Sequence, residues 1–192
     1  MNKFDILNGT KIKPEMLKEI INLDKKVYEE KYWTNIGFMT KWFSKNPYII
    51  TMIYDKGNLA GYFCYLPIED ESYLEIRKGE VFQDLTIPVE NIKKYKKGES
   101  NNLYLFSIVL DPKYQGTDAL RYLLKGFYDN TKELKEKGVI FNKLLGDVVS
   151  DKGYKLAKSL GFNKVYDTEY NSVMFESYYD NMIEKYEKKY KE

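Results

Sequence analysis

The feature that most constrains this chain is a strand, a turn and a helix that follow one another in residues 103–134. Residues 103–110 (LYLFSIVL) form a nearly uninterrupted apolar run, which is typical of a central strand covered on both faces. A turn with Pro112 and Gly116 follows, and it leads into a long amphipathic helix that begins near Ala119. Because a strand buried on both sides needs helices above and below it, this segment predicts an α/β fold.

The remaining segments supply the other layers of such a fold. We expect the order helix, helix, hairpin, strand, helix, strand, helix, hairpin, with the first hairpin in residues 48–66. This order describes an α/β sandwich on a mixed sheet. Residues 69–102 are rich in charge, and we interpret them as an insertion or lid because they are too short for a core of their own. We therefore predict one domain over residues 1–177, followed by an amphipathic helix over residues 178–192.

The composition excludes several kinds of site. The 192 residues contain no histidine, which excludes Ser-His-Asp and Cys-His catalysis and histidine-ligated metal sites. Cys64 is the one cysteine, so neither an intramolecular disulfide nor a cysteine metal cluster can form. A formal charge of +2 falls short of the basic excess of a dedicated nucleic-acid binder, and no apolar run reaches the roughly 18 residues of a membrane span. We expect a soluble, cytoplasmic protein with no metal, nucleic-acid or membrane partner.

The turn between Leu110 and Ala119 is the best candidate for a binding site. A buried strand that runs into a tight turn and then a helix directs several free backbone N–H groups and the positive end of the helix dipole to one point. Such a point binds anions, and a pyrophosphate suits it well. Any strand-to-helix connection has some of this character, so a plain structural connection stays as the alternative.

The wider pattern resembles the Gcn5-related N-acetyltransferase (GNAT) superfamily. In that family an apolar strand ends in Val-x-Pro-x-x-Gln/Arg-Gly-x-Gly-x-Gly/Ala, and the start of the next helix binds the pyrophosphate of coenzyme A. Residues 110–120 here read Leu-Asp-Pro-Lys-Tyr-Gln-Gly-Thr-Asp-Ala-Leu, and two leucines follow at 123–124 as in the family. A later Leu-Gly-Phe signature is matched by residues 160–162, and Ser150 stands where the family usually has a helix-capping Asn. The resemblance covers most of the chain, except the charged insertion and the final helix.

This resemblance implies a GNAT-like acyl-CoA N-acyltransferase sandwich, with helices on both sides of a central mixed sheet. It implies acetyl-CoA as co-substrate and direct transfer of the acetyl group, in a ternary complex, to an amine of a small molecule or peptide. A backbone N–H at the end of the central strand would hold the acyl carbonyl. Whether the chain forms a homodimer stays open. The cofactor-binding residues that the resemblance implies are Ile108, Val109, Leu110, Gln115, Gly116, Thr117, Asp118, Ala119, Leu120 and Ser150.

Three departures from the family pattern favour a different function. Asp118 and Leu120 replace loop glycines, and side chains at these positions oppose the close approach of a phosphate. Ala157 stands where the family has a tyrosine acid, so we name Tyr154, one helical turn earlier, as the candidate catalytic residue, with packing as its alternative role. The family's frequent glutamate base has no counterpart in residues 103–110. A GNAT-like module that has lost turnover and senses a ligand or binds a protein is therefore the alternative function.

Three further groups have both a functional and a structural interpretation. Cys64 can be an acyl-accepting nucleophile or a small buried apolar residue. Glu80 and Asp84 can supply a base from the insertion or lie as solvated charges. Tyr32, Trp33 and Trp42 can line an acceptor pocket between the first helices and the lid or belong to the core.

Overall fold

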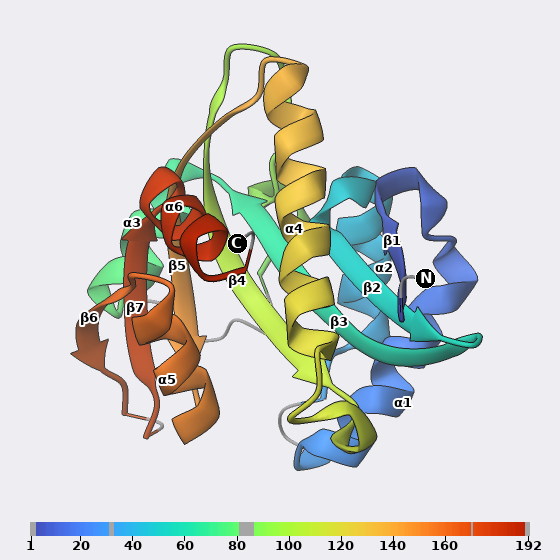
Figure 1. Ribbon diagram of the computed structural model, residues 1–192. Helices are drawn as coiled ribbons and strands as arrows, with labels where there is room; N and C mark the ends of the chain where they lie inside the picture. The colour runs from blue at the N-terminus through green and yellow to red at the C-terminus, as the bar shows by residue number, and fades with distance from the viewer. Residues whose placement is uncertain (1–2, 31–32, 81–86, 170, 191–192) are drawn as a thin grey trace.

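A seven-stranded mixed sheet forms the centre of the molecule, in the order β1-β2-β3-β4-β5-β7-β6 (Figure 1). The computed structural model describes residues 3–30, 33–80, 87–169 and 171–190. β4 and β5 pair in parallel, and the other neighbouring strands pair antiparallel. The predicted mixed sheet is confirmed. Its strands are β1 (Asp5–Asn8), β2 (Ile50–Asp55), β3 (Asn58–Ile68), β4 (Ser100–Leu110), β5 (Ile140–Val148), β6 (Asn163–Asp167) and β7 (Val173–Tyr178).

Helices cover both faces of this sheet. They are α1 (Leu17–Val27), α2 (Ile36–Lys45), α3 (Asp70–Lys78), α4 (Ala119–Glu136), α5 (Asp151–Ser159) and α6 (Tyr179–Tyr190). The first three pack on one face, which we call the α1 face, and the last three pack on the other, the α4 face (Figure 1). Each layer of helices forms its own apolar core with the sheet side chains that point toward it. None of the described helices has both the length and the apolar composition that crossing a membrane requires.

α4 packs unusually closely on the sheet because Gly126 has no side chain. A Cβ at this position would lie 2.4 Å from Thr51 Cγ2 and 2.7 Å from Ile6 Cγ2. The Gly126 carbonyl accepts a hydrogen bond from Asn8 Nδ2 at 2.9 Å, which joins the helix to β1. These contacts fix α4, and with it the turn that precedes α4, relative to the strands.

β4 and β5 pair along their first halves and then diverge. The parallel register runs from Ser100 opposite Ile140 to Leu105 opposite Gly146. Beyond Leu105, β4 continues to Leu110 with β3 as its partner, and β5 turns away from it (Figure 1). No described strand pairs with the other edge of this second half of β4. The sheet therefore has a gap in its middle.

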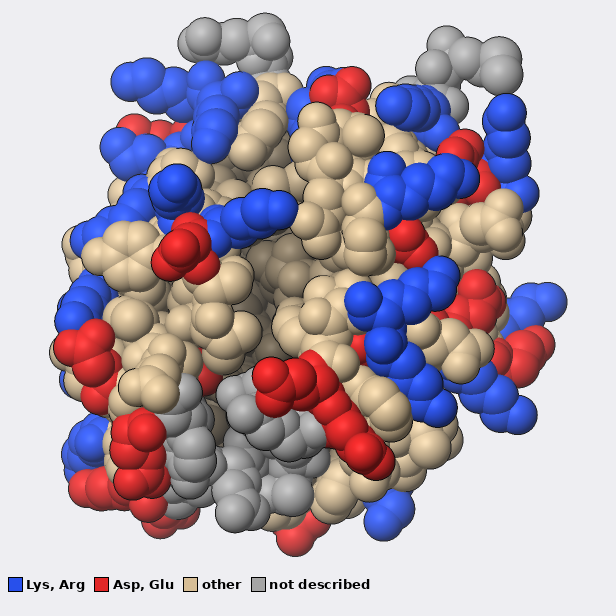
Figure 2. All heavy atoms as spheres, turned by 90° about the horizontal axis from the view of Figure 1, so that it is seen from below, with Lys and Arg blue, Asp and Glu red and all other residues tan. Residues whose placement is uncertain are grey.

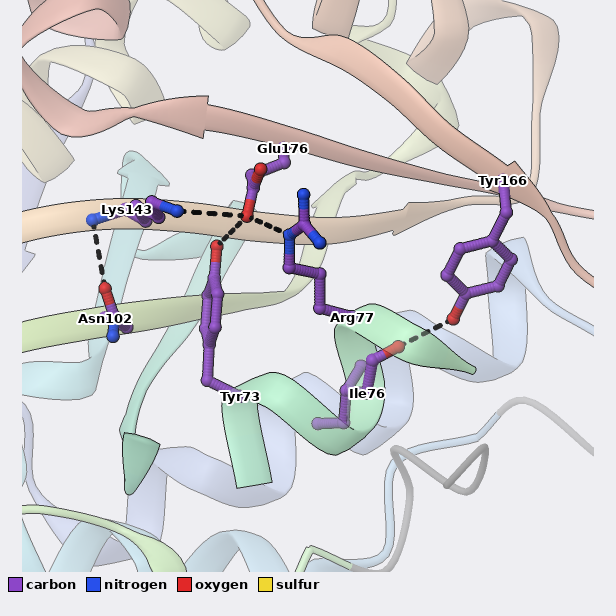
Figure 3. Close-up of polar contacts among 7 residues, drawn as sticks. All are labelled: Tyr73, Ile76, Arg77, Asn102, Lys143, Tyr166 and Glu176. Atoms are coloured by element: carbon purple, nitrogen blue, oxygen red, sulfur yellow. Dashed lines mark hydrogen bonds and ion pairs between the residues drawn. The ribbon is translucent and has the colours of Figure 1, made fainter. Parts of the chain in front are cut away.

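The charged segment after β3 contains α3, a helix that the sequence pattern does not predict. Glu176 on β7 accepts hydrogen bonds from Tyr73 Oη at 2.8 Å and from Arg77 Nε at 2.7 Å (Figure 3). Tyr166 Oη, on β6, donates to the carbonyl oxygen of Ile76 at 2.7 Å. Because α3 follows β3 directly, these bonds tie the two halves of the diverging sheet together on the α1 face.

We expect Arg77→Met to destabilise the protein in a pH-dependent way. Burial raises the pKa of Glu176, but hydrogen bonds from Arg77 and Tyr73 outweigh it, and the pKa lies below its ordinary value. A carboxyl with a depressed folded pKa stabilises the protein above its unfolded pKa, and this stabilisation is lost as pH falls through the folded pKa. The free energy of unfolding should fall by about 1 kcal/mol at pH 7, because Arg77 is partly exposed.

Urea denaturation of both proteins at neutral pH and at about pH 3.5, near and below the ordinary carboxyl pKa, measures this effect. The difference between wild type and Arg77→Met should shrink at the lower pH. Lys78→Met, which removes an exposed charge from the same helix, is the control and should change stability by less than about 0.5 kcal/mol. A difference for Arg77→Met that is equal at both pH values contradicts the assignment.

Candidate functional site

The open edge of β4 presents backbone groups to the gap between β4 and β5. The Asp111 N–H donates to the carbonyl oxygen of Ala60 at 2.9 Å, and Leu110 lies opposite Gly61 in the β3 register. Successive N–H groups of an antiparallel strand point to alternate sides. The N–H groups of Leu110 and Ile108 therefore point away from β3 and into the gap, where no described strand pairs with them.

The gap lies at the end of the molecule where a hollow opens. Figure 2 shows this end, with a hollow whose walls are mostly uncharged and with both basic and acidic side chains around its mouth. Residues 105–108 of β4 are half-buried, although β4 is a central strand. This partial exposure indicates that the hollow reaches the strand itself.

Internal hydrogen bonds hold the turn after β4 in place. The Asp111 carboxylate accepts a bond from Lys26 Nζ at 2.8 Å, and this contact lowers the pKa of Asp111. The Thr117 hydroxyl donates to the carbonyl oxygen of Tyr114 at 2.7 Å and accepts from the Ala119 N–H at 3.2 Å. The Thr117 side chain thus closes the turn just before α4 begins.

Four N–H groups of the turn and of the first turn of α4 are available to a ligand. They belong to Gly116, Asp118, Leu120 and Arg121, and none of them donates to a described residue. The amides of Gln115, Thr117 and Ala119 are bonded within the turn. The anion site therefore has fewer available amides than the sequence pattern predicts.

The side chains of Asp118 and Leu120, which replace family glycines, form no hydrogen bond with these amides. Asp118 is exposed, and its carboxylate caps no amide of α4. Leu120 is half-buried and packs against the core of the α4 face. Gly116, the glycine that is kept, has a φ of +77°, which a residue without a side chain adopts at little cost. The leucine side chain at position 120 is thus accommodated because it packs into the core of the α4 face.

Lys152, which the sequence analysis did not single out, contacts the turn from α5. Its Nζ donates to Gln115 Oε1 at 2.8 Å. Ser150 caps α5 through its hydroxyl, which places Lys152 in the first turn of that helix. Lys113 and Arg121, by contrast, lie over the tyrosine rings next to them in sequence. No local pattern indicates the contact of Lys152, because it joins the start of α5 to a turn that is far away in the chain.

Tyr154 lies on α5 near the point where the strands diverge. Its ring is edge-on to Phe175, with centroids 5.2 Å apart. Phe175 is opposite Gly146, the last β5 residue that pairs with β4. The side chain of Tyr154 is 39% exposed, whereas Ala157, the position of the family tyrosine, is buried. Tyr154 therefore has a packing contact and an accessible ring on the α4 face.

A buried carboxylate, also missed by the sequence analysis, lies on the α1 face. Asp24 is 0% exposed and accepts hydrogen bonds from Tyr62 Oη at 2.6 Å and from the Thr34 N–H at 3.0 Å. Burial raises the pKa of Asp24, and the bonds from Thr34 and Tyr62 offset part of this rise. Tyr62 Oη also lies 3.2 Å from Ser107 Oγ on the open half of β4. No cationic side chain among the described residues pairs with Asp24.

The other candidate residues have the following places. Cys64 is fully buried, and burial raises the pKa of its thiol, which favours the role of a buried apolar residue. Trp42 is fully buried in the core of the α1 face, and Trp33 is half-buried. Glu80 is exposed, and Tyr32 and Asp84 lie outside the described residues.

Solved structures of low sequence identity share this architecture. The loading GNATL domain of CurA from Lyngbya majuscula covers 92% of this chain and 98% of its own at 12% identity, with a TM-score of 0.67. The yncA protein of Salmonella typhimurium, a putative acetyltransferase solved with its cofactor acetyl-CoA, covers 92% and 94% at 13% identity, with a TM-score of 0.55. Arabidopsis thaliana Naa50, in complex with the bisubstrate analogue CoA-Ac-MVNAL, covers 92% and 99% at 11% identity, with a TM-score of 0.55. This chain has the GNAT fold.

The GNAT fold that the sequence resemblance implies is thereby confirmed, including the mixed sheet between two layers of helices. Comparison of the sequence with family models and with curated proteins finds no match. The likeness therefore concerns the fold, and the function is argued from the site.

Proposed function

We propose that the chain transfers an acetyl group from coenzyme A to an amine. The observation that carries the proposal is the gap between β4 and β5, which leads from the open N–H groups of Ile108 and Leu110 to the start of α4. A pantetheine arm that ends in a pyrophosphate needs strand-like hydrogen bonds along its length and an anion site at one end. Solved proteins with this fold that were captured with acetyl-CoA or a coenzyme A analogue support this choice.

The pyrophosphate fits the start of α4. The free amides of Gly116, Asp118 and Leu120 and the positive end of the helix dipole would bind it. Lys152 adds a positive charge at 2.8 Å from Gln115, on the α5 side of the turn. The exposed carboxylate of Asp118 opposes binding, weakly because solvent screens it. Of the other predicted cofactor residues, Thr117 and Ala119 shape the turn, Ser150 caps α5, and the N–H of Val109 faces β3.

The thioester end fits the open half of β4. An N–H of Ile108 or Leu110 would donate to the acyl carbonyl and stabilise the negative charge that develops there. The amine nitrogen forms a bond to the carbonyl carbon, the C–S bond breaks, and sulfur keeps the electron pair. Thiols have a pKa of roughly 8.5, so the thiolate can depart without prior protonation. Tyr154, which is accessible beside the gap, is our candidate for the group that returns a proton to sulfur.

Acetyl-CoA should bind to the protein and raise its thermal stability. A ligand that binds the folded state alone stabilises it by about 2.7 kcal/mol at about 100 times Kd. A thermal unfolding series with acetyl-CoA, and with pantetheine as the control that lacks the pyrophosphate, measures this. Release of free thiol from acetyl-CoA in the presence of a diamine, an aminoglycoside and peptides with free amino termini then tests transfer. No stabilisation at millimolar acetyl-CoA contradicts the proposal and favours the ligand-sensing or protein-binding module.

Asp118→Gly should tighten the binding of coenzyme A by about two- to threefold, because it removes one like charge near the pyrophosphate. Isothermal titration calorimetry of both proteins gives the two values of Kd. Asp118→Asn, which removes the charge and keeps the side chain, separates repulsion from steric hindrance. Affinity that stays the same or weakens in Asp118→Gly shows that residue 118 does not face the ligand.

Lys152→Met should weaken the binding of coenzyme A by about fivefold, the size of one charge-assisted contact near a helix terminus. Lys132→Met is the matched control, because it removes an exposed charge about 20 Å along α4 from the anion site. The same calorimetry at two salt concentrations should show a weaker salt dependence for Lys152→Met alone. Equal losses in the two variants point to net charge as the cause and contradict a contact by Lys152.

A further inference from the structure

Polar side chains on the α1 face form a connected chain that ends beside the gap. Tyr62 Oη bonds to Asp24 at 2.6 Å and lies 3.2 Å from Ser107 Oγ. Tyr28, at the end of α1, forms a hydrogen bond with Ser107 as well. Asp24 and Tyr62 are fully buried, whereas Ser107 and Tyr28 are half-buried. The chain therefore leads from a buried carboxylate to an accessible hydroxyl.

A β-bulge directs Ser107 toward this chain. The β3–β4 register shifts between Cys64 and Tyr65, so Phe106 has no partner in it. The ring of Phe106 packs against Trp42 on the α1 face, with centroids 5.2 Å apart. Ser107 points to the same face, since its hydroxyl lies beside that of Tyr62. A regular strand would place these neighbouring side chains on opposite faces. The bulge thus turns the Ser107 hydroxyl to the α1 face. The next residue along the strand is Ile108, whose N–H points into the gap.

The geometry fixes the direction of the hydrogen bonds. The hydroxyl of Tyr62 has one hydrogen, and the carboxylate of Asp24 accepts it. Ser107 must therefore donate in its contact with Tyr62. The Ser107 oxygen keeps a lone pair that can accept a hydrogen from a ligand in the gap. Each hydroxyl is thus oriented to pass a proton inward, from Ser107 to Tyr62 and from Tyr62 to Asp24.

The carboxylate at the inner end has no counter-ion among the described residues. A buried acid is costly unless it is paired with a cation or neutralised, and no described cation pairs with Asp24. Its environment favours the uptake of a proton, since burial outweighs the hydrogen bonds that it accepts. Such an arrangement beside a cleft is typical of a functional acid or base.

We propose that Ser107, Tyr62 and Asp24 form a relay that removes the proton from the acceptor amine. This inference rests on the proposed acetyl transfer and names a base in place of the family's glutamate, which has no counterpart in residues 103–110 of this chain. Ser107 is the catalytic residue of the relay, because it contacts the amine. Tyr62 and Asp24 act through Ser107.

The proton balance of the step is complete. The acceptor amine enters as an ammonium, and one of its protons moves to Ser107 Oγ, which frees the nitrogen lone pair. The hydroxyl hydrogen of Ser107 moves to Tyr62 Oη, and that of Tyr62 moves to Asp24 Oδ1. The nitrogen then bonds to the thioester carbon, the C–S bond breaks with its electron pair on sulfur, and the second surplus proton of the nitrogen passes to that sulfur. Because neither hydroxyl is ionised in this transfer, the elevated pKa of Tyr62 does not oppose it.

The relay and Tyr154 lie on opposite faces of the sheet. The relay belongs to the α1 face, and Tyr154 packs on Phe175 within the α4 face. The amine would therefore lose its proton on one side of the gap while sulfur leaves toward the other. This arrangement separates the two substrates in space.

Tyr62→Phe is the sharpest test, since it interrupts the relay and keeps the carboxylate and its bond to Thr34. Tyr65→Phe is the matched control. Tyr65 is equally buried on the same strand, but its hydroxyl contacts Thr51 and Asn130 on the α4 face. We expect Tyr62→Phe to lower kcat/KM for the best amine of the panel by about 100-fold or more at pH 7. Tyr65→Phe should stay within about twofold, and acetyl-CoA affinity should be unchanged in both.

The pH profile distinguishes a relay from a structural role. The titratable groups that face Asp24 are Tyr28, Tyr62 and Cys64, and burial raises the pKa of all three. Asp24 is therefore the carboxyl of this described cluster, and burial raises its pKa as well. Without the relay the amine must arrive deprotonated, so the rate of Tyr62→Phe should rise tenfold per pH unit up to the amine pKa of roughly 10. The wild-type rate should depend much less on pH between 7 and 9.

The outcomes separate the relay from the function on which it rests. The relay is supported if all variants bind acetyl-CoA and if kcat/KM for the amine falls in Tyr62→Phe and in Ser107→Ala but not in Tyr65→Phe. Bound acetyl-CoA with an unchanged rate and pH profile in Tyr62→Phe overturns the relay and leaves the proposed transfer intact. Absence of acetyl-CoA binding in the wild type overturns both.

Discussion

The divergence of β4 from β5 is the constraint on which the rest of the structure depends. A central strand normally pairs on both edges, yet beyond Leu105 β3 is the one described strand that pairs with β4. A backbone N–H that is buried without a partner costs roughly 1–3 kcal/mol, so this edge has to remain open to water or to a ligand. α3, which follows β3 and is hydrogen-bonded to Glu176 on β7, links the two halves of the sheet across this separation. The gap is therefore part of the folded architecture.

The two faces of the sheet contribute different chemistry to this gap. On the α4 face lie the free amides at the start of α4, Lys152 and the accessible ring of Tyr154. On the α1 face lies the hydroxyl chain that ends at Asp24. Under the proposed function an anionic cofactor arm would lie on the first face and a cationic amine on the second, next to a buried acid that no described cation pairs with. The proposed acyl transfer thus requires neither a histidine nor a glutamate in β4.

The central segment was predictable because its signals are local. The apolar run before Pro112, the glycine at 116 and the apolar stripe that begins at Ala119 specify a strand, a turn and a helix in succession. The sequence of α3 gives weaker signals, namely acidic residues in its first turn, basic residues in its last and Gly79 after it. These signals were missed because the segment is rich in charge and lacks a clear apolar stripe. Its buried residues, Tyr73 and Ile76, contact strands that are distant in sequence, so their burial is not evident from the local pattern.

The site residues that were missed depend on tertiary contacts. Asp24 gives a local signal, because it follows Ile20 by one turn on the buried face of α1 and interrupts its apolar stripe. Its partners Tyr62 and Ser107 cannot be read from spacing, since a bulge in β4 brings them together. The same holds for Lys152 at the start of α5 and Gln115 in the turn after β4, which form a hydrogen bond although they are far apart in the chain. Hydrogen bonds within the turn occupy the amides of Thr117 and Ala119, so these two amides are not available to an anion. The sequence pattern does not specify these bonds either.

Amide resonances of β4 and the following turn, recorded by NMR with and without coenzyme A, test the central claim most directly. The account predicts that the N–H signals of Ile108, Leu110, Gly116 and Leu120 shift and become protected from exchange. The amides of Leu103 and Tyr104, in the half of β4 that is paired with β5, should stay unchanged. Shifts confined to other parts of the molecule, or no shifts at saturating coenzyme A, would contradict the account.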